Sequence, residues 1–328
     1  MASELPAELK AAIERRIEGM SRSDAARRSR SISDTYRSGG NSLSIKSDED
    51  ALAYALVRMP ATYAAIGACL GAIAEARPEF APATLLDVGA GPGTATWAAN
   101  HSFPSLGEFA LIDSNDSLRA LALELAKASS SLGAASYVKG DAATLLATSQ
   151  PADLVVASYV AGELGDTARA NLADAMWSKT NDTLLIVEPG TPSGYARIVD
   201  LRAHLIAKGA HVVAPCPHDK ACPLEDPDWC HFSQRLARSR AHKQIKGADV
   251  PFEDEKFSYV ALSRAPIPER PSRVLAQPKI SKVAVKMKVC TTGGVETKTV
   301  PHRDKRNYSI LRKLNWGDAI PQKFLPAE

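Results

Sequence analysis

The chain has 328 residues, which is enough for one large domain and a smaller appendage. Its formal net charge of +3, from 40 basic and 37 acidic residues, is too small to indicate a partner by itself. We find no signal peptide and no apolar run long enough to span a bilayer, so the sequence argues against a secreted disulfide scaffold and against a membrane partner.

Residues 1–47 are predicted to form a basic N-terminal region with one short helix, LPAELKAAIERRIEGM, and then a flexible Ser/Arg/Gly arm. Between Arg15 and Lys46 there are eight basic residues and three acidic ones. The four glutamates in and around the helix are unlike an acid-poor transit sequence. We therefore expect a cytoplasmic bacterial protein, or a mitochondrial one if the source is eukaryotic.

Residues 48–265 are predicted to form the main domain, which begins with helices interrupted near Pro60. The segment TLLDVGAGPGTATWAA, residues 84–99, is an apolar strand, a glycine turn and a helix start. Such a turn allows a ligand to approach the backbone, and the helix N-terminus supplies free N–H groups. The cofactor-binding residues predicted here are Asp87, Gly89, Gly91 and Gly93.

Four more strands are predicted to follow: EFALIDSND, ASYVKGDAATL, DLVVASYV and TLLIVEPG. The second strand of the series ends in Asp113, which we expect to accept hydrogen bonds from ribose hydroxyls, and the third ends near Asp141, which we expect to flank an adenine. Five strands alternating with helices predict a doubly wound, Rossmann-like α/β sheet with its ligand at the strand C-termini. S-adenosylmethionine is favoured over NAD, because we find no second constellation for hydride transfer.

The loop after the fourth strand, Ser158 to Glu163, is where a methyltransferase would hold its target base. It lacks the Asn/Asp-Pro-Pro-Tyr motif of adenine N6 enzymes. Tyr159 could stack on a base and Glu163 could act as a general base, although a structural role is at least as compatible with either. The catalytic residues therefore stay unknown, with these two as weak candidates.

Three of the five cysteines, Cys216, Cys222 and Cys230, lie within fifteen residues in the loop 214–232. Soft thiolate ligands favour zinc or an iron–sulfur cluster over calcium or magnesium. The candidates for a fourth ligand are Cys290, Cys69, His218 and His231. We expect Cys290, in a strand-like segment, whereas Cys69 lies in a helical pattern typical of a core residue. The spacing leaves zinc and an iron–sulfur cluster equally open.

Two further basic segments follow the cysteine loop. The residues Arg235, Arg238, His242 and Lys246 are spaced to form one stripe if the segment is helical, and we predict that this stripe binds RNA. Residues 266–328 are predicted to form a basic, β-rich appendage, with thirteen basic and four acidic residues from Arg270 onward. A solvated surface is the alternative for any single run, but three such segments together favour RNA contact.

Several segments together resemble the methyltransferase-like family of the small ribosomal subunit, whose mitochondrial members assist assembly of that subunit. These segments are YALVRMPATYAA, LLDVGAGPGTATWAA, DLVVASYVAGEL, LLIVEPGTPSGYARI, APCPHDKACPL, DWCHFSQRLARS and FEDEKFSYVALSR. The resemblance implies an S-adenosylmethionine-binding methyltransferase fold and a role on small-subunit rRNA. It also implies a [4Fe–4S] cluster held by Cys216, Cys222, Cys230 and Cys290, with zinc as the alternative.

Two functions follow from this resemblance. The first is an S-adenosylmethionine-dependent rRNA methyltransferase that acts in ribosome assembly, favoured by the complete glycine turn. The second is a non-catalytic RNA-binding assembly factor that keeps the methyltransferase scaffold and the cluster, favoured by the absent target-base motif. We expect a monomeric, bacterial member whose partners are the small subunit and its rRNA.

Overall fold

The five strands predicted from residues 84 to 189 lie side by side in an eight-stranded mixed sheet in the computed structural model, which describes residues 4–18, 21–37, 42–238, 243 and 250–320. The strands are β1 (Thr84–Val88), β2 (Glu108–Asp113), β3 (Ser136–Lys139), β4 (Ala152–Ser158), β5 (Thr180–Pro189), β6 (His211–Ala214), β7 (Phe232–Ala237) and β8 (Phe252–Ser263). Their order along the sheet is β3-β2-β1-β4-β5-β8-β6, and β7 also pairs with β8.

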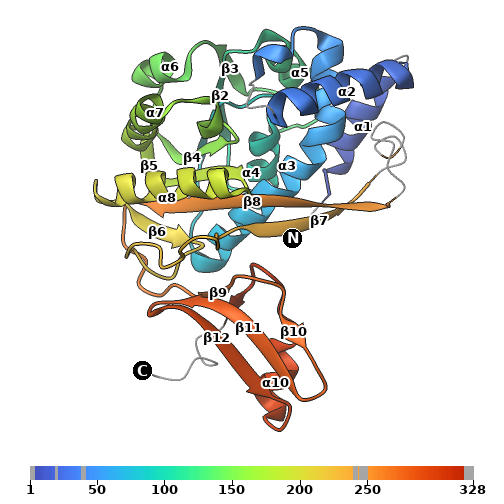
Figure 1. Cartoon of the computed structure of the whole chain (residues 1–328). Coiled ribbons are helices and arrows are strands. Elements are labelled where there is room, and N and C mark those ends of the chain that lie inside the picture. The colour runs from blue at the N-terminus through green and yellow to red at the C-terminus, as the bar shows by residue number, and fades with distance from the viewer. Residues whose placement is uncertain (1–3, 19–20, 38–41, 239–242, 244–249, 321–328) are drawn as a thin grey trace.

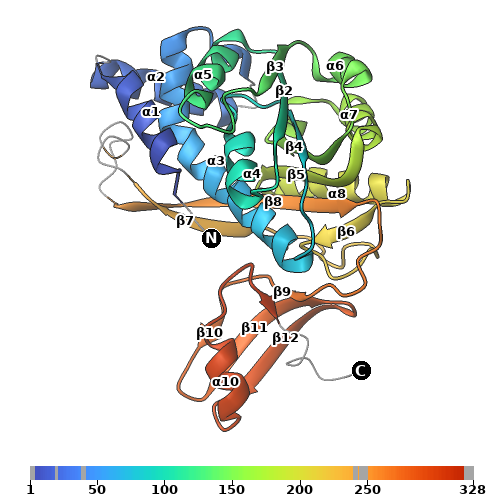
Figure 2. The ribbon, with the colours of Figure 1, turned by 180° about the vertical axis from the view of Figure 1, so that it is seen from behind.

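Strands β1 to β5 run parallel, and the apolar runs of β1, β4 and β5 are buried because helices cover both sides of the sheet. Helices α3, α4 and α5 lie on one side, and α6, α7 and α8 lie on the other (Figures 1 and 2). These helices are α3 (Asp48–Ala76), α4 (Thr94–Ser102), α5 (Asp116–Ala126), α6 (Ala142–Thr148), α7 (Asp166–Ser178) and α8 (Pro192–Ile206), and the short helix η2 (Ala161–Glu163) follows β4. The order of strands reverses between β1 and β4, which is where open α/β sheets bind their ligands.

Helix α3 is one continuous helix of 29 residues, so the predicted interruption near Pro60 was wrong. A proline inside a helix removes one backbone hydrogen bond, but α3 is buried along most of its length, and packing on both sides of Pro60 holds it together. Thr62 also donates its hydroxyl to the carbonyl of Arg58, at 3.1 Å, within this turn.

The same helix corrects a second expectation from the sequence. By length and apolar composition α3 could cross a membrane, so the chain does contain a sufficiently long apolar run. Its most apolar window is 83% buried inside the protein. We therefore assign α3 as a core helix. We call the eight-stranded sheet and the helices that cover it the body.

The N-terminal region contains α1 (Ala7–Ile17), α2 (Arg22–Arg37) and the short helix η1 (Ser42–Ser44). Residues 22–37 were predicted to be part of a flexible arm, and this was wrong because they form α2 and pack on α3. The guanidinium group of Arg28 pairs with Asp24 at 2.7 Å and with Asp50 of α3 at 2.6 Å. A basic residue of the predicted arm thus forms an ion pair that connects α2 to α3.

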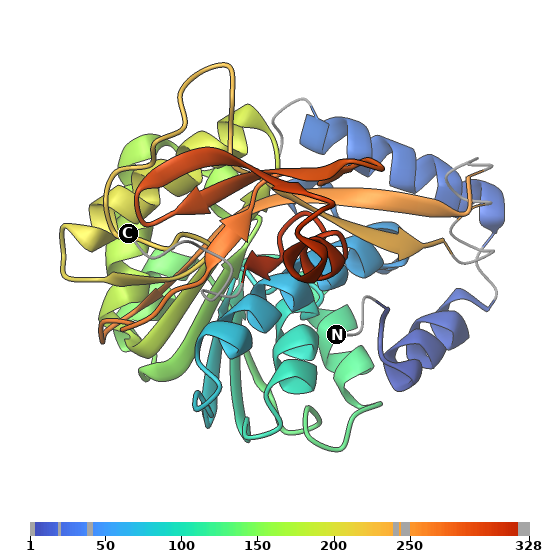
Figure 3. The same cartoon turned by 90° about the horizontal axis from the view of Figure 1, so that it is seen from below.

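The C-terminal appendage has its own five-stranded sheet and a small core. It consists of β9 (Ser272–Val274), β10 (Lys279–Ile280), β11 (Ala284–Thr291), β12 (Gly294–Pro301), α10 (Lys305–Leu311) and β13 (Ala319–Ile320). Its core is formed by Val274, Val285, Met287, Val289, Tyr308, Leu311 and Ile320. Figure 3 views the molecule from the appendage side, with β11 and β12 in front of the body. We keep the division of the chain at residues 47 and 265 as a proposal.

Candidate cofactor crevice and cysteine cavity

The glycine turn after β1 has the backbone that only glycine adopts readily. The φ angles of Gly89, Gly91 and Gly93 are +68°, +54° and +77°. At Gly89 a Cβ atom would lie 2.3 Å from Cγ2 of Val160, so this position also requires glycine for close packing. The turn therefore joins β1 to α4 at the reversal of strand order, as predicted from the sequence.

Acidic groups surround this turn. Asp87 is fully buried, and its Oδ2 accepts hydrogen bonds from the backbone and side chain of Thr96 at 3.0 and 2.7 Å. Its Oδ1 has no hydrogen-bond partner among the described residues. Burial raises the pKa of Asp87 to about 7. An unpartnered buried carboxylate oxygen is well suited to receive a cationic group from a ligand.

Asp113 lies at the end of β2, as predicted, and its carboxylate is already hydrogen-bonded within the protein. Its Oδ2 accepts from the backbone N–H of Gly91 at 2.9 Å, and its Oδ1 accepts from that of Asn115 at 2.7 Å. Burial raises the pKa of Asp113. Asp141 caps α6 by accepting from the backbone N–H of Thr144 at 2.9 Å and is exposed. Contact of either residue with ribose or adenine stays a prediction.

A segment from the N-terminal region lies across the same end of the sheet. The amide of Asn115 donates to the carbonyls of Ser42 and Ile45, both at 2.9 Å. The backbone N–H of Ser42 donates to Oε1 of Glu163 at 3.2 Å. We call residues 42–45 the strap, because they connect the loop after β2 with the loop after β4. Although Glu163 is exposed as a residue, burial of its carboxyl group raises its pKa to about 7.

Tyr159 follows β4 with a φ of +61°, in the left-handed region that non-glycine residues rarely adopt. Its hydroxyl donates to Oε1 of Glu255 at 3.3 Å, and Glu255 also pairs with Arg58 of α3 at 3.0 Å. Burial raises the pKa of Tyr159 well above its usual value. This arrangement holds the phenol against α3 and β8, so a role in stacking on a base stays a prediction. Arg58 and Glu255 had no recognisable signal in the sequence, because they meet only through the fold.

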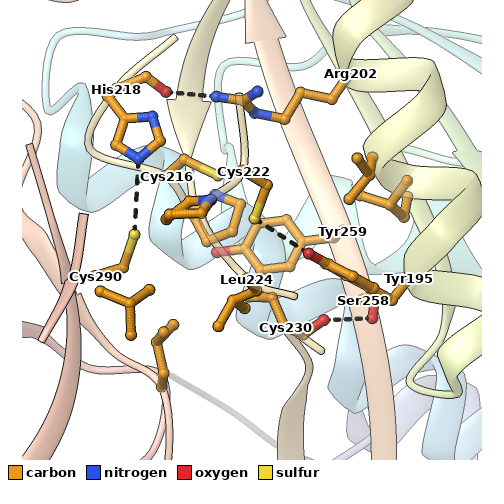
Figure 4. A pocket seen from close by; sticks show the side chains of 16 residues that line it. Tyr195, Arg202, Cys216, His218, Cys222, Leu224, Cys230, Ser258, Tyr259 and Cys290 are labelled. Atoms are coloured by element: carbon orange, nitrogen blue, oxygen red, sulfur yellow. Dashed lines mark hydrogen bonds between the residues drawn. The ribbon is translucent and has the colours of Figure 1, made fainter. Parts of the chain in front are cut away.

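All four predicted cysteine ligands line one cavity between the body and the appendage (Figure 4). Cys216, Cys222 and Cys230 come from the loop after β6, and Cys290 comes from β11. Burial, and then repulsion from the thiolates of Cys216 and Cys222, raises the pKa of Cys290 to about 12. Cys69 is fully buried in α3 and belongs to the hydrophobic core, as predicted.

His218, a predicted candidate for the fourth ligand, also lines the cavity, together with Tyr195 and Arg202, which the sequence did not reveal. Tyr195 of α8 donates its hydroxyl to Sγ of Cys222 at 3.2 Å, and Nε2 of His218 lies 3.9 Å from Sγ of Cys290. Arg202 of α8 is only 4% exposed, and its Nη2 donates to the carbonyl of His218 at 2.7 Å. Nε of Arg202 and Nε of Arg273 lack acceptors among the described residues.

The four cavity cysteines and the side chains around them suit a metal centre bound by several thiolates. Four thiolates would carry a large negative charge, and the buried guanidinium groups of Arg202 and Arg273 supply positive charge beside them. Over the described ranges, no three His, Cys, Asp or Glu side chains form a group that could hold a single metal ion. His231 stacks on Trp229 and is not among the residues that line the cavity.

The predicted RNA-binding stripe was wrong in its secondary structure. Arg235 lies in strand β7, which pairs with β8, and not in a helix. Arg235 pairs with Asp254 at 2.7 Å and Arg238 pairs with Glu253 at 3.1 Å, so both charges are matched by carboxylates of β8. His242 and Lys246 lie outside the described residues.

The strand order and the glycine turn at the reversal point define a doubly wound α/β protein, and acidic groups surround that turn. Residues 48–321 match the family described as mitochondrial small ribosomal subunit Rsm22. The chain belongs to this family, as the resemblance in the sequence implied.

Named relatives extend this result. The chain is 30% identical over 300 residues to the human "Ribosome assembly protein METTL17, mitochondrial", with 82% of this chain and 62% of the relative covered. It is 25% identical over 334 residues to "Rsm22-cox11 tandem protein 2, mitochondrial" of Schizosaccharomyces pombe, with 84% and 43% covered. The chain thus spans less than two thirds of the length of either relative.

Solved structures of methyltransferases are similar to this chain at lower sequence identity. A magnesium protoporphyrin IX methyltransferase from Synechocystis PCC 6803 with bound SAM has 11% identity and a TM-score of 0.40, with 62% of this chain and 80% of that chain covered. An O-methyltransferase family protein from Burkholderia thailandensis has 12% identity and a TM-score of 0.42, with 66% and 60% covered.

Proposed function

We propose that this protein is an S-adenosylmethionine-binding assembly factor of the small ribosomal subunit. The observation that carries the cofactor assignment is the unpartnered Oδ1 of buried Asp87 beside the glycine turn. S-adenosylmethionine has a sulfonium and an ammonium group, and the carboxyl groups of Asp87, Asp113 and Glu163 at this end of the sheet favour such a cation. Membership of the Rsm22 family supports the assignment to the small subunit. The names of the relatives support a mitochondrial location over the bacterial cytoplasm.

Methyl transfer to rRNA is the second candidate function. It is favoured by Glu163, because a carboxyl group with a pKa of about 7 is suited to act as a general base near neutral pH. It is disfavoured by the position of Tyr159, whose hydroxyl is bonded to Glu255 on the α3 side. The assembly role without catalysis therefore ranks first, and methyl transfer is the alternative to test.

We further propose that Cys216, Cys222, Cys230 and Cys290 hold a [4Fe–4S] cluster, with zinc as the alternative. A four-iron cluster accommodates thiolates that stand farther apart than the ligands of one ion, which agrees with four thiols around one cavity and no compact ligand group in the described part of the chain. When bound, such a cluster would supply a covalent connection between the body and the appendage. Arg202 and Tyr195 would orient and stabilise the thiolates from α8.

The test of the function uses anaerobically prepared protein and small subunits purified from a strain that lacks it. Binding of labelled S-adenosylmethionine and of subunits is measured first, and transfer of labelled methyl to rRNA second, with Gly91→Arg as the control. Cofactor and subunit binding without transfer would support the assembly role. Transfer that is lost in Gly91→Arg would establish the enzyme, and failure to bind subunits would exclude both.

The test of the metal centre is chemical analysis of the purified protein. We expect iron and acid-labile sulfide in the unmodified chain and a marked loss of both in Cys222→Ser. Cys69→Ala is the matched control, because Cys69 is a thiol of the core outside the cavity. Zinc without sulfide would support the alternative, and equal metal content in all three proteins would exclude a cysteine-bound centre.

A further inference from the structure

The appendage has one outer sheet face that consists of lysine and threonine side chains. Lys286 of β11 lies directly opposite Lys279 of β10 on one side and Thr299 of β12 on the other. Lys288 lies opposite Thr297. Residues opposite each other in antiparallel strands share a face, as do residues two apart in one strand. We call these five residues the Lys/Thr face.

The strand alternation directs this face away from the appendage core. Val285, Met287 and Val289 are the residues of β11 that alternate with Lys286 and Lys288, and all three are buried with Tyr308 and Leu311 of α10. Helix α10 therefore covers the opposite side of the sheet. At its Cys290 end this side of the sheet meets the cysteine loop, where Lys288 pairs with Asp228. The other four residues of the Lys/Thr face are exposed.

The positive charge on this face is poorly balanced within the protein. Lys279 and Lys286 are both exposed, and neither has a carboxylate within ion-pair distance among the residues that the structure describes. Only Lys288 is paired, with Asp228 of the cysteine loop. Like charges directly opposite each other in a sheet are unfavourable, and an anion placed between them removes the repulsion.

More basic residues lie at the free end of the same sheet. The backbone N–H of His302 donates to the carbonyl of Val283 at 2.7 Å, which brings the segment after β12 beside the β10–β11 turn. Lys282, His302 and Arg303 are exposed there. Positive charge thus continues from the Lys/Thr face to the tip of the appendage.

We propose that the Lys/Thr face binds the phosphate backbone of helical RNA. Lysine ammonium groups contact phosphates as point charges, and threonine hydroxyls donate to phosphate oxygens. The face has no aromatic side chain on which a base could stack, so it is suited to the backbone of a duplex and not to unpaired bases. This inference rests on the proposed function, and it names the surface of the chain that contacts rRNA.

The experiment measures binding of the full-length, metal-loaded protein to a fluorescent RNA duplex over a series of salt concentrations. The test variant is Lys279→Gln with Lys286→Gln. The matched control is Lys127→Gln with Lys208→Gln, which removes the same charge from exposed positions of the body. Two lost phosphate contacts should lower the slope of log Kd against log salt by about 2 and weaken binding about 60-fold at about 0.1 M salt.

The melting temperature provides an independent readout. It should be unchanged or higher in the test variant, because one repulsive lysine pair has been removed. Equal weakening in the test and control variants would overturn the inference and indicate a general effect of net charge. Unchanged duplex binding by the test variant with loss of subunit binding would also overturn it, because the face would then contact a ribosomal protein. Unmodified protein that binds neither RNA nor subunits would instead refute the proposed function.

Discussion

The backbone N–H of Ser42 donates to the carboxylate of Glu163 at 3.2 Å, which connects the N-terminal region to the loop after β4. In the loop after β2, the side-chain amide of Asn115 donates to the carbonyls of Ser42 and Ile45. The strap therefore crosses the end of the sheet at which the cofactor is proposed to bind. A ligand that enters there has to share the space between β1 and β4 with residues 42–45.

Removal of the Glu163 carboxylate should loosen the strap. A hydrogen bond of this kind contributes about 1 kcal/mol, so in Glu163→Ala we expect hydrogen exchange at the Ser42 amide to accelerate by roughly fivefold. Glu124→Ala, on the exposed side of α5, serves as the control. Unchanged exchange at Ser42 in Glu163→Ala would contradict the role of this contact.

The stability of the ligand-free protein should depend on pH through Asp87. Its pKa is about 7 in the folded protein, above the ordinary value of 3.8, so the folded state favours the protonated form. Its contribution is present below about pH 4 and is lost as the pH rises through about 7, with an upper limit of about 4 kcal/mol in the free energy of unfolding. Urea unfolding at several pH values should show this decline, and Asp87→Asn should reduce it. A bound cation favours the ionised form, so affinity for S-adenosylmethionine should rise over the same pH range.

Gly89→Ala should destabilise the protein by about 2–5 kcal/mol, because it combines a left-handed backbone with a clash against Val160. Adding Val160→Ala should remove the clash and recover that part of the lost free energy of unfolding. The part that comes from the left-handed backbone should remain. Thermal or urea unfolding of both single variants and the double variant measures the coupling. Additive effects would mean that Gly89 and Val160 do not meet in this way.

Arg202→Gln should weaken retention of the metal centre. The change removes a buried positive charge and the donor to the His218 carbonyl, both beside the cysteine loop. We expect a lower iron content after purification and faster loss of the visible absorption in the presence of a chelator. Arg264→Gln is the control, since Arg264 also donates to backbone carbonyls but lies outside the cavity. Equal losses from the two variants would show that Arg202 acts only through general stability.

The central strands and the glycine turn were predictable because their signals are local. Continuous apolar runs in β1, β4 and β5 identify strands buried on both sides, and glycine spacing identifies the turn. The grouping of the cysteines around one cavity was also predictable, because few other roles suit three thiols in a proline-rich loop. Methyl transfer, the ligands of the metal and RNA contact stay proposals.

The failures came from contacts between distant segments. The sequence around Arg235 and Arg238 is compatible with a helix as well as with a strand. Only the pairing of these residues with β8 shows that the segment is a strand. Pro60 is a helix breaker by its local chemistry, but tertiary packing overrides that preference in α3. The strap could not be predicted, because Ser42 and Glu163 are brought together by the topology of the sheet.

The distribution of the four cavity cysteines along the chain has a consequence for biosynthesis. Cys216, Cys222 and Cys230 leave the ribosome before β8 and β9, whereas Cys290 follows only after both strands. Domains fold in order as a chain emerges, so the body can form before the last thiol is available. A polypeptide that ends prematurely, before β11, would lack Cys290 together with every residue of the Lys/Thr face except Lys279. The cavity can thus gain its last thiol only after β9 and β10 of the appendage have been made.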